Sequence, residues 1–180
     1  MSKIIFCNNS LRGLILFRKD VFESYAEEGV TVILVAPKDC DFNYNNPLIR
    51  FIPIKIESSS RNILKDMRLF ISLFKIYKKE NPDFIFNYTI KPNIYGSIAA
   101  KLCNIPSCAM IAGLGYAFDG NGFTKRIMRM CYRFSLRFPK KVIVLNTGNR
   151  DYLIFHKYIK KEQLVLLKGG EGVNIDQYRP

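Results

Sequence analysis

Residues 82–101 read PDFIFNYTIKPNIYGSIAAK, and this stretch decides the fold class. Residues 83–87 form a short apolar run without clean alternation, which is typical of a strand covered on both of its faces. After a polar loop, Gly96, Ala99 and Ala100 recur at helical spacing and predict a helix packed closely against a sheet. A strand followed by a loop and a helix is the repeating unit of an α/β protein with a parallel sheet.

The same alternation continues along all 180 residues. It predicts an α/β fold of the Rossmann-like, doubly wound type: a mostly parallel sheet with helices on both faces, formed by one domain over residues 1–180. The expected strands span residues 3–7, 31–36, 49–54, 83–87, 107–111, 141–145 and 164–167. The expected helices span residues 14–28, 61–79, 94–103, 124–137 and 149–157.

The composition suits a globular protein with an anionic partner. Hydrophobic residues make up 48% of the chain, enough to bury a core, which excludes a fibre or a disordered tail. The net charge of +13 predicts contact with phosphate, nucleic acid or a lipid surface. The charge is uneven: residues 1–60 hold seven bases and seven acids, residues 61–120 eight against four, and residues 121–180 thirteen against four.

Cysteine usage and the absence of export signals favour the cytoplasm. The five cysteines form no CxxC pair and four lie in apolar surroundings, so we expect reduced thiols and neither disulfides nor a zinc ribbon. No apolar run reaches 18 residues, and the N-terminus lacks the apolar region of an export signal. The cysteines are Cys7, Cys40, Cys103, Cys108 and Cys131.

The loop after the first predicted strand reads NNSLRG, residues 8–13. A dinucleotide-binding enzyme needs GxGxxG at this place, so that its backbone can approach a pyrophosphate, and only Gly13 is present. Nicotinamide and flavin enzymes are therefore disfavoured, and no cofactor is expected. The groups that remain candidates for substrate binding are Asn8, Asn9, Arg12 and Gly13. The alternative is that residues 8–10 only turn the chain and cap the next helix.

The loop of residues 88–93 is a candidate anion site. Lys91 precedes a predicted helix, and a cation there adds to the positive end of the helix dipole, an arrangement that favours phosphate. Thr89 and Asn93 flank it and are further candidates for substrate binding. The alternative is a solvated surface lysine.

A third loop, in the string IAGLGYAF of residues 111–118, follows another predicted strand. Gly113 and Gly115 allow the backbone to bend near a ligand, and Tyr116 offers a flat ring with a hydroxyl. The alternative is a simple tight turn.

Residues 123–138 predict a basic amphipathic helix. Phe123, Ile127, Met130, Phe134 and Phe138 recur every three to four residues, which forms an apolar row beside a row of arginines. The segment has no acidic residue, a pattern typical of docking onto anionic lipid headgroups. The alternative is a sheet-packing helix with a solvated outer face. The expected docking residues are Lys125, Arg126, Arg129, Arg133, Arg137, Lys140 and Lys141.

Catalytic and metal-binding patterns are sparse. His156 lies in a lysine-rich helix, and no HxH, HExxH, GxSxG or P-loop string occurs, so no metal site is expected. Asp119 and Glu171 are the carboxylates nearest the strand-end loops, without partners for acid–base work. The catalytic residue stays unassigned.

Several strings in order resemble the N-terminal half of GT4-type glycosyltransferases, particularly those that extend lipid-linked glycans for bacterial surface polysaccharides. After Asn8–Arg12 they read PDFIFNYTIKPNIYGSIAAKLCNIP, AMIAGLGYAFDG, KVIVLNTGNRDYL and GGEGVNIDQYRP. The chain departs from relatives at Asn174 and Tyr178, where Asp and Phe are frequent, and it has Thr89 and Lys91 in the region where many relatives place a His.

The resemblance implies one half of a GT-B fold, in which this domain binds the acceptor and a second domain, absent from this chain, binds the nucleotide-sugar donor. It further implies retained anomeric configuration, no required metal, and a position for Glu171 where the two domains meet. An exposed interdomain face would allow two copies of the isolated half to pair.

These observations predict the acceptor-binding domain of a retaining glycosyltransferase. It would move a sugar from a nucleotide-sugar to a polyprenyl-diphosphate-linked glycan while docked on the cytoplasmic membrane face, and this half alone would be inactive. One alternative is a non-catalytic membrane-anchoring subunit of a split enzyme. The other is a basic nucleic-acid-binding module, disfavoured because no RNP string or zinc pattern is present.

Overall fold

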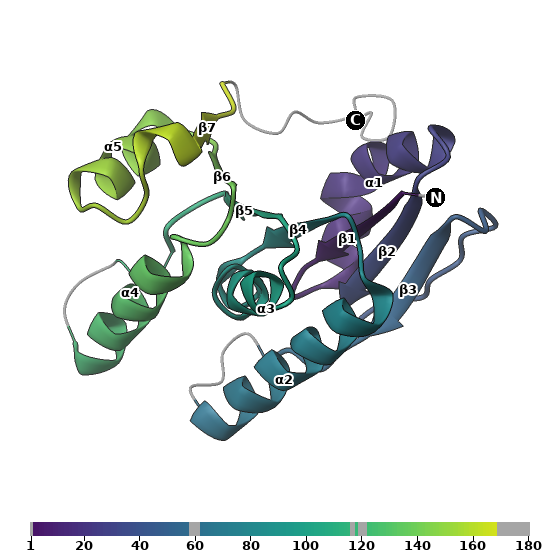
Figure 1. Cartoon of the computed structure of the whole chain (residues 1–180), viewed down its shortest axis with the longest axis horizontal. Coiled ribbons are helices and arrows are strands. Elements are labelled where there is room, and N and C mark those ends of the chain that lie inside the picture. The colour runs from purple at the N-terminus through teal and green to yellow at the C-terminus, as the bar shows by residue number, and fades with distance from the viewer. Residues whose placement is uncertain (1, 58–61, 116–117, 119–121, 169–180) are drawn as a thin grey trace, which may run out of the picture.

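Seven parallel strands form a single sheet in the computed structural model (Figure 1). The strand order β3-β2-β1-β4-β5-β6-β7 reverses direction between β1 and β4, which confirms the predicted doubly wound fold. The strands are β1 (Lys3–Cys7), β2 (Thr31–Ala36), β3 (Ile49–Pro53), β4 (Phe84–Tyr88), β5 (Ser107–Ile111), β6 (Lys141–Val144) and β7 (Leu164–Leu166).

The structure describes residues 2–57, 62–115, 118 and 122–168. Its helices are α1 (Leu11–Glu27), α2 (Ile63–Glu80), α3 (Ser97–Leu102), α4 (Phe123–Ser135) and α5 (Thr147–Phe155), with a π-helical turn η1 (Pro92–Gly96) and a 3-10 turn η2 (Lys161–Gln163). None of these helices combines the length and hydrophobicity that a bilayer crossing needs.

Helix boundaries follow the capping residues. Helix α1 begins three residues earlier than its apolar spacing predicts, because the Ser10 side chain accepts a hydrogen bond from the Gly13 N–H at 2.9 Å. Helix α2 begins after Asn62, whose side chain accepts from two backbone N–H groups. The predicted helix over residues 94–103 is instead the π-helical turn η1 running directly into α3.

Both faces of the sheet are covered, as the unalternating strands predict. On one face, α2 and α3 pack over odd positions of β1 such as Ile5 and Cys7. On the other face, α1 packs over even positions such as Ile4 and Phe6. A third cluster joins α4 and α5 to β5 and β6. All five cysteines are free thiols, and burial raises the pKa of the Cys7 thiol to about 12, which keeps it protonated and unreactive.

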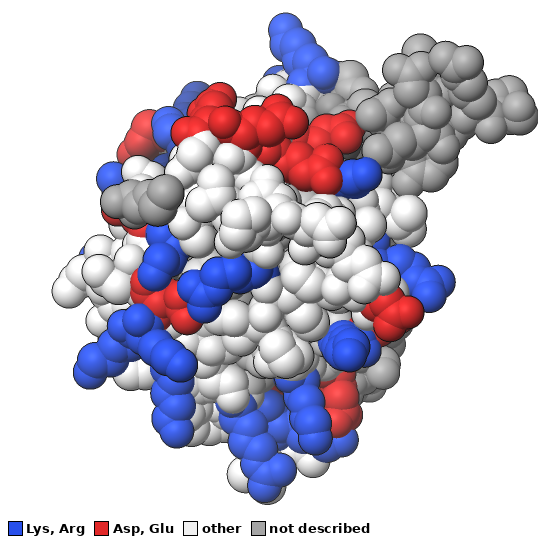
Figure 2. Space-filling view, turned by 90° about the vertical axis from the view of Figure 1, so that its right-hand side faces the viewer, with Lys and Arg blue, Asp and Glu red and all other residues white. Residues whose placement is uncertain are grey.

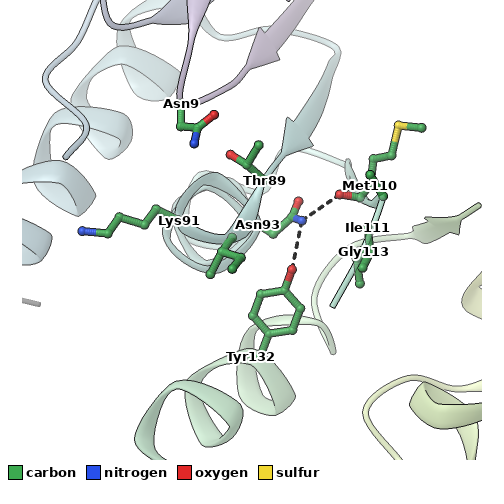
Figure 3. Close-up of a pocket in the computed structure, with 10 residues that line it drawn as sticks. Asn9, Thr89, Lys91, Asn93, Met110, Ile111, Gly113 and Tyr132 are labelled. Atoms are coloured by element: carbon green, nitrogen blue, oxygen red, sulfur yellow. Dashed lines mark hydrogen bonds between the residues drawn. The ribbon is translucent and has the colours of Figure 1, made fainter. Parts of the chain in front are cut away.

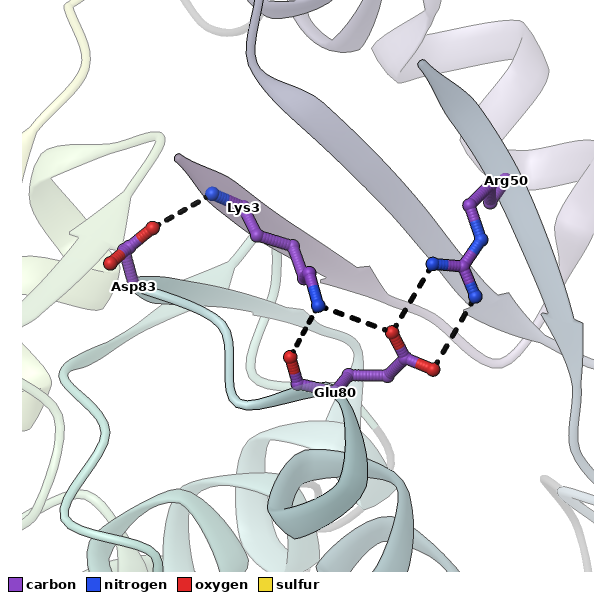
Figure 4. A network of polar contacts seen from close by, with 4 residues as sticks. All are labelled: Lys3, Arg50, Glu80 and Asp83. Carbon is purple, nitrogen blue, oxygen red and sulfur yellow. Dashed lines mark hydrogen bonds and ion pairs between the residues drawn. The ribbon is translucent and has the colours of Figure 1, made fainter. Parts of the chain in front are cut away.

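An ion-pair network fastens the end of α2 to the sheet (Figure 4). The Glu80 carboxylate is 8% exposed and accepts from the Arg50 guanidinium at 3.3 and 3.4 Å. The Lys3 Nζ lies 3.5 Å from the same carboxylate and donates to the Glu80 carbonyl oxygen at 2.6 Å. The Lys3 backbone N–H donates to Asp83 at 2.8 Å. These contacts fix α2 relative to the amino-terminal edge of β1, at the opposite end of the strand from the loops that follow β1 and β4.

Candidate functional site

A pocket of about 270 Å³ lies where the loops after β1, β4 and β5 meet, at the carboxyl edge of the sheet next to the reversal of strand order (Figure 3). Ligands of open parallel sheets bind at this position. Its lining combines polar side chains with an apolar wall: Asn9, Thr89, Ile90, Lys91, Asn93, Met110, Ile111, Ala112, Gly113 and Tyr132.

Asn93 joins the pocket to α4. It is completely buried in η1, and its Nδ2 donates to the Met110 carbonyl oxygen at 2.8 Å and to the Tyr132 hydroxyl at 3.2 Å. Burial raises the pKa of Tyr132 to about 12, so its hydroxyl is neutral at physiological pH. The two hydrogen bonds hold η1, β5 and α4 together around the pocket.

Lys91 forms an ion pair with a residue of α2. Its Nζ lies 2.6 Å from the Asp66 carboxylate, and the two side chains are only 13% and 19% exposed. The Tyr95 hydroxyl donates to the other Asp66 oxygen at 3.0 Å, and burial followed by the Asp66 charge raises the pKa of Tyr95. The lysine that the sequence marks as an anion ligand thus has a carboxylate partner, and that partner ties the pocket to α2.

The backbone of Thr89 has the left-handed conformation, with φ at +67°. A β-branched residue adopts this conformation only at a cost in free energy, and such residues persist where the surrounding structure enforces them, often at functional sites. The Thr89 carbonyl oxygen accepts from the Asn93 N–H at 2.9 Å, which links the residue that follows β4 to η1.

The loop after β1 caps α1 and also borders the pocket. Ser10 Oγ donates to Asp39 at 2.6 Å, and the Arg12 backbone N–H donates to the same carboxylate at 3.0 Å. The capping alternative for residues 8–10 is therefore confirmed for Ser10. Asn9 lines the pocket, whereas Asn8 is buried beside it and Arg12 is exposed.

Helix α4 has an apolar face that is exposed in the described part of the chain. Its buried side packs Tyr132 and Leu136, at its C-terminal cap, into the core. The predicted apolar row lies on a different side and is exposed, at 81% for Phe123 and 66% for Met130, with Ile127 and Phe134 also exposed. The arginine row lies between these two sides, so the exposed apolar face of α4 has cations directly beside it.

Helix α2 has a similar exposed surface in its first half. Ile63 and Leu64 are 79% and 70% exposed, and Met67 and Ile71 are exposed as well. Figure 2 shows Lys and Arg gathered along the lower edge of the molecule, the side on which α2 runs in Figure 1, and acidic side chains along the upper edge. Both α2 and α4 pack against η1, so these two helices flank the turn that contains Asn93 and directly follows Lys91.

Comparison with known proteins shows which family the chain belongs to. A family model described as glycosyl transferase 4-like matches residues 4–146. The chain belongs to this family. As a glycosyl transferase 4-like domain it has the Rossmann-like fold of one half of a GT-B protein, as the sequence resemblance predicts.

Two curated relatives match this glycosyl transferase 4-like domain. The N,N'-diacetylbacillosaminyl-diphospho-undecaprenol alpha-1,3-N-acetylgalactosaminyltransferase of Campylobacter jejuni is 25% identical over 187 residues, covering 99% of this chain and 48% of the relative. The UDP-Gal:alpha-D-GlcNAc-diphosphoundecaprenol alpha-1,3-galactosyltransferase of Escherichia coli is 26% identical over 134 residues, covering 72% and 33%. The chain thus spans half or less of the length of these relatives.

A solved structure supports the fold. The sucrose-phosphate synthase of Thermosynechococcus elongatus superimposes with a TM-score of 0.73 at 16% identity, covering 100% of this chain and 50% of that one.

The structure brings together five of the eleven binding residues predicted for the glycosyl transferase 4-like domain. Asn9, Thr89, Lys91, Asn93 and Gly113 line one pocket. Asn8, Arg12, Gly13 and Gly115 lie outside its lining, and Tyr116 and Glu171 lie outside the described residues. Sequence reasoning missed Met110 and Tyr132, because their roles depend on a backbone carbonyl and on a tyrosine within a helix otherwise marked by arginines.

Replacing Asp39 by asparagine is expected to reduce the loss of stability in acid. Burial raises the pKa of Asp39, but hydrogen bonds from Ser10 and the Arg12 N–H outweigh burial and leave the pKa below its ordinary value of 3.8. A carboxyl with a lowered pKa stabilises the fold above the unfolded-state pKa, and this stability is lost as pH falls from about 5 through the folded-state pKa. Thermal unfolding should therefore show a smaller Tm decrease for Asp39→Asn than for the wild type between about pH 6 and about pH 3.

The matched control is Asp41→Asn, which removes a nearby acidic charge and leaves the hydrogen bonds of Asp39 in place. It should follow the wild-type profile. Parallel Tm decreases for the wild type and Asp39→Asn would show that the Ser10 cap does not depend on the ionised carboxylate.

Proposed function

We propose that this chain is the acceptor-binding half of a retaining glycosyltransferase. The complete enzyme would transfer a sugar from a nucleotide-sugar to a polyprenyl-diphosphate-linked glycan, and this half would bind that glycan at the cytoplasmic face of the membrane. Family membership supports glycosyl transfer. The names of both curated relatives contain an N-acetylated sugar joined to diphosphoundecaprenol, which supports the class of acceptor.

The observation on which the proposal rests is that the pocket adjoins η1, against which α2 and α4 both pack, and that both helices have exposed apolar side chains. Tyr132 in the pocket wall belongs to α4, and Lys91 in the same wall is paired with Asp66 of α2. An acceptor on a polyprenyl chain lies at the membrane surface, so its sugar reaches a pocket only if the protein docks with the pocket close to the lipid. The exposed apolar faces of α2 and α4 provide such a docking surface.

Cations beside these apolar faces favour an anionic membrane. Each Lys or Arg near such a surface contributes about 1 kcal/mol of attraction. Arg126 and Arg133 are exposed on α4, and Lys140 and Lys141 are exposed just beyond it. Helix α2 adds exposed bases of its own: Lys65, Arg68, Lys75, Lys78 and Lys79.

The donor side of the reaction is proposed to belong to a second domain of similar size. This domain would hold the nucleotide-sugar against the carboxyl edge of the sheet, near the pocket, and transfer would use no metal ion. Pairing of two copies of the isolated half stays a prediction.

A transfer assay tests the proposal. An immunoblot of cells that express the natural gene first decides which form of the protein is assayed. A band at about twice 20.9 kDa would indicate that the donor half is on the same polypeptide. A band at 20.9 kDa would require a pull-down to isolate the second chain. That complete protein is then incubated with undecaprenyl-diphosphate-linked GlcNAc and a panel of nucleotide-sugars. We expect a lipid-linked disaccharide by mass spectrometry, with the donor's anomeric configuration retained by NMR. No product from any donor would overturn the proposal, and an inverted product would overturn the retaining mechanism.

A further inference from the structure

The pocket contains a buried hydrogen-bond acceptor that the described residues leave unpartnered. Asn93 is completely buried, and its Oδ1 has no hydrogen-bond partner in the described part of the chain. The amide orientation is fixed, because the Met110 carbonyl oxygen can only accept and must face Nδ2. Figure 3 shows Oδ1 pointing away from Tyr132, on the opposite side of the amide from the Nδ2 hydrogen bonds.

A buried acceptor such as Asn93 Oδ1 is normally paired with a hydrogen-bond donor. Native proteins satisfy nearly all such groups, because a buried acceptor without a donor loses its hydrogen bond to water and gains nothing in return. Asn93 Oδ1 can accept only from an N–H or O–H group, since it carries no hydrogen itself. A ligand in this pocket with a hydrogen-bond donor would supply the missing partner.

The rest of the pocket favours an uncharged ligand. Lys91, the cation in its lining, is paired with Asp66 at 2.6 Å, and its side chain extends away from Asn93 in Figure 3. Ile90, Met110 and Ile111 provide an apolar wall in the same pocket. A volume of about 270 Å³ is near the lower end of small-molecule sites, at about 300 Å³, and suits one sugar ring.

We infer that this pocket binds the 2-acetamido group of the acceptor sugar, with the acetamido N–H donating to Asn93 Oδ1 and its methyl group contacting the apolar wall. A hydroxyl at the same carbon could donate to Oδ1 but would leave the wall uncovered. The pocket would thereby select acceptors with an N-acetylated sugar next to the diphosphate. This inference rests on the proposed function, because it takes the acceptor to be a lipid-linked sugar.

The test compares two acceptors that differ only at this group. Anionic nanodiscs carry undecaprenyl-diphosphate-linked GlcNAc, the same lipid bearing glucose, or no glycolipid, and binding of the 180-residue chain is measured by surface plasmon resonance. This chain is suitable because its own helices cover both faces of the sheet. The wild type should bind the GlcNAc nanodiscs about 10-fold more tightly than the glucose nanodiscs.

Two variants locate the hydrogen bond. Asn93→Leu removes the acceptor and should weaken the binding of both glycolipids by about 10-fold, because the 2-hydroxyl of glucose can also donate to Oδ1. Asn45→Leu makes the same change at an exposed residue outside the pocket lining and should leave both affinities unchanged. If Asn93→Leu does not fold, the wild-type comparison of GlcNAc with glucose nanodiscs still tests the acetamido contact.

Three results would overturn the inference. Equal binding of both glycolipids by the wild type, each tighter than bare nanodiscs, would remove the acetamido site and leave the proposed function in place. Unchanged GlcNAc binding by folded Asn93→Leu would show that Asn93 Oδ1 does not contact the acceptor. Binding of neither glycolipid above bare nanodiscs would overturn the proposed acceptor as well.

Discussion

Replacing Gly96 by alanine is expected to destabilise the fold by about 3 kcal/mol, although alanine is the better helix former. A Cβ at this position would lie 2.3 Å from Asn87 Oδ1 and 3.0 Å from the Tyr77 hydroxyl oxygen. Both partners are completely buried, and the Tyr77 hydroxyl donates to Asn87 Oδ1 at 3.1 Å, so neither can move without breaking their hydrogen bond. Thermal unfolding should show a Tm lower by roughly 6–12 °C.

Gly113→Ala is the matched control for stability. A Cβ at Gly113 would have no atom of the described, non-adjacent residues within 4 Å, so the Tm of this variant should stay within about 2 °C of the wild type. A Gly96→Ala protein as stable as Gly113→Ala would show that η1 can move away from β4. The claim that close packing of η1 on the sheet fixes the position of Asn93 would then be wrong.

Removing the exposed apolar face of α4 is expected to abolish most membrane binding. The triple variant Phe123→Ser, Met130→Ser and Phe134→Ser replaces side chains that are 81%, 66% and 52% exposed, so the folded core loses little. If each side chain contributes about 1 kcal/mol on entering the lipid, the three together account for a loss of about 100-fold. Flotation with phosphatidylglycerol-containing vesicles measures this change.

A matched variant tests whether exposed apolar residues elsewhere on the protein contribute equally to vesicle binding. Phe17→Ser, Val21→Ser and Phe155→Ser replace side chains that are 66%, 46% and 80% exposed on α1 and α5, and should leave vesicle binding unchanged. Equal losses in both variants would contradict a specific docking face. Vesicle binding that survives the α4 variant, or tight, salt-sensitive RNA binding without vesicle binding, would overturn the docking proposal.

The arginine row has a separate expected contribution. Reversing Arg126 and Arg133, both exposed on α4, to glutamate should weaken vesicle binding by about 1 kcal/mol per charge, and the effect should shrink as salt rises.

The parallel sheet could be predicted from sequence because its signal is local. Buried strands such as β1 and β5 are continuous apolar runs, and their predicted bounds agree with the structure at both ends. Helix ends were less predictable from apolar spacing, because α1 begins at a serine cap that precedes its first spaced apolar residue. The π-helical turn was not predictable, since it depends on the close approach of Gly96 to Asn87 across the core.

The candidate site was predictable only in part. Its loops could be located, because parallel strands end at a common edge of the sheet. The partner of Lys91 could not, since Asp66 lies 25 residues away in the sequence, on a different helix. Tyr132 was hidden for a similar reason: it faces the core from the helix whose arginines and exposed phenylalanines dominate the pattern.

The central claim is that this chain binds a lipid-linked sugar acceptor, and its most direct test is equilibrium binding to nanodiscs of equal anionic charge with and without undecaprenyl-diphosphate-linked GlcNAc. Nanodiscs without glycolipid report docking through α2 and α4 alone. Because the pocket adjoins η1, against which both helices pack, we expect the glycolipid to tighten binding by about 10-fold or more. Equal affinity for both kinds of nanodisc would contradict an acceptor site at the carboxyl edge of this sheet.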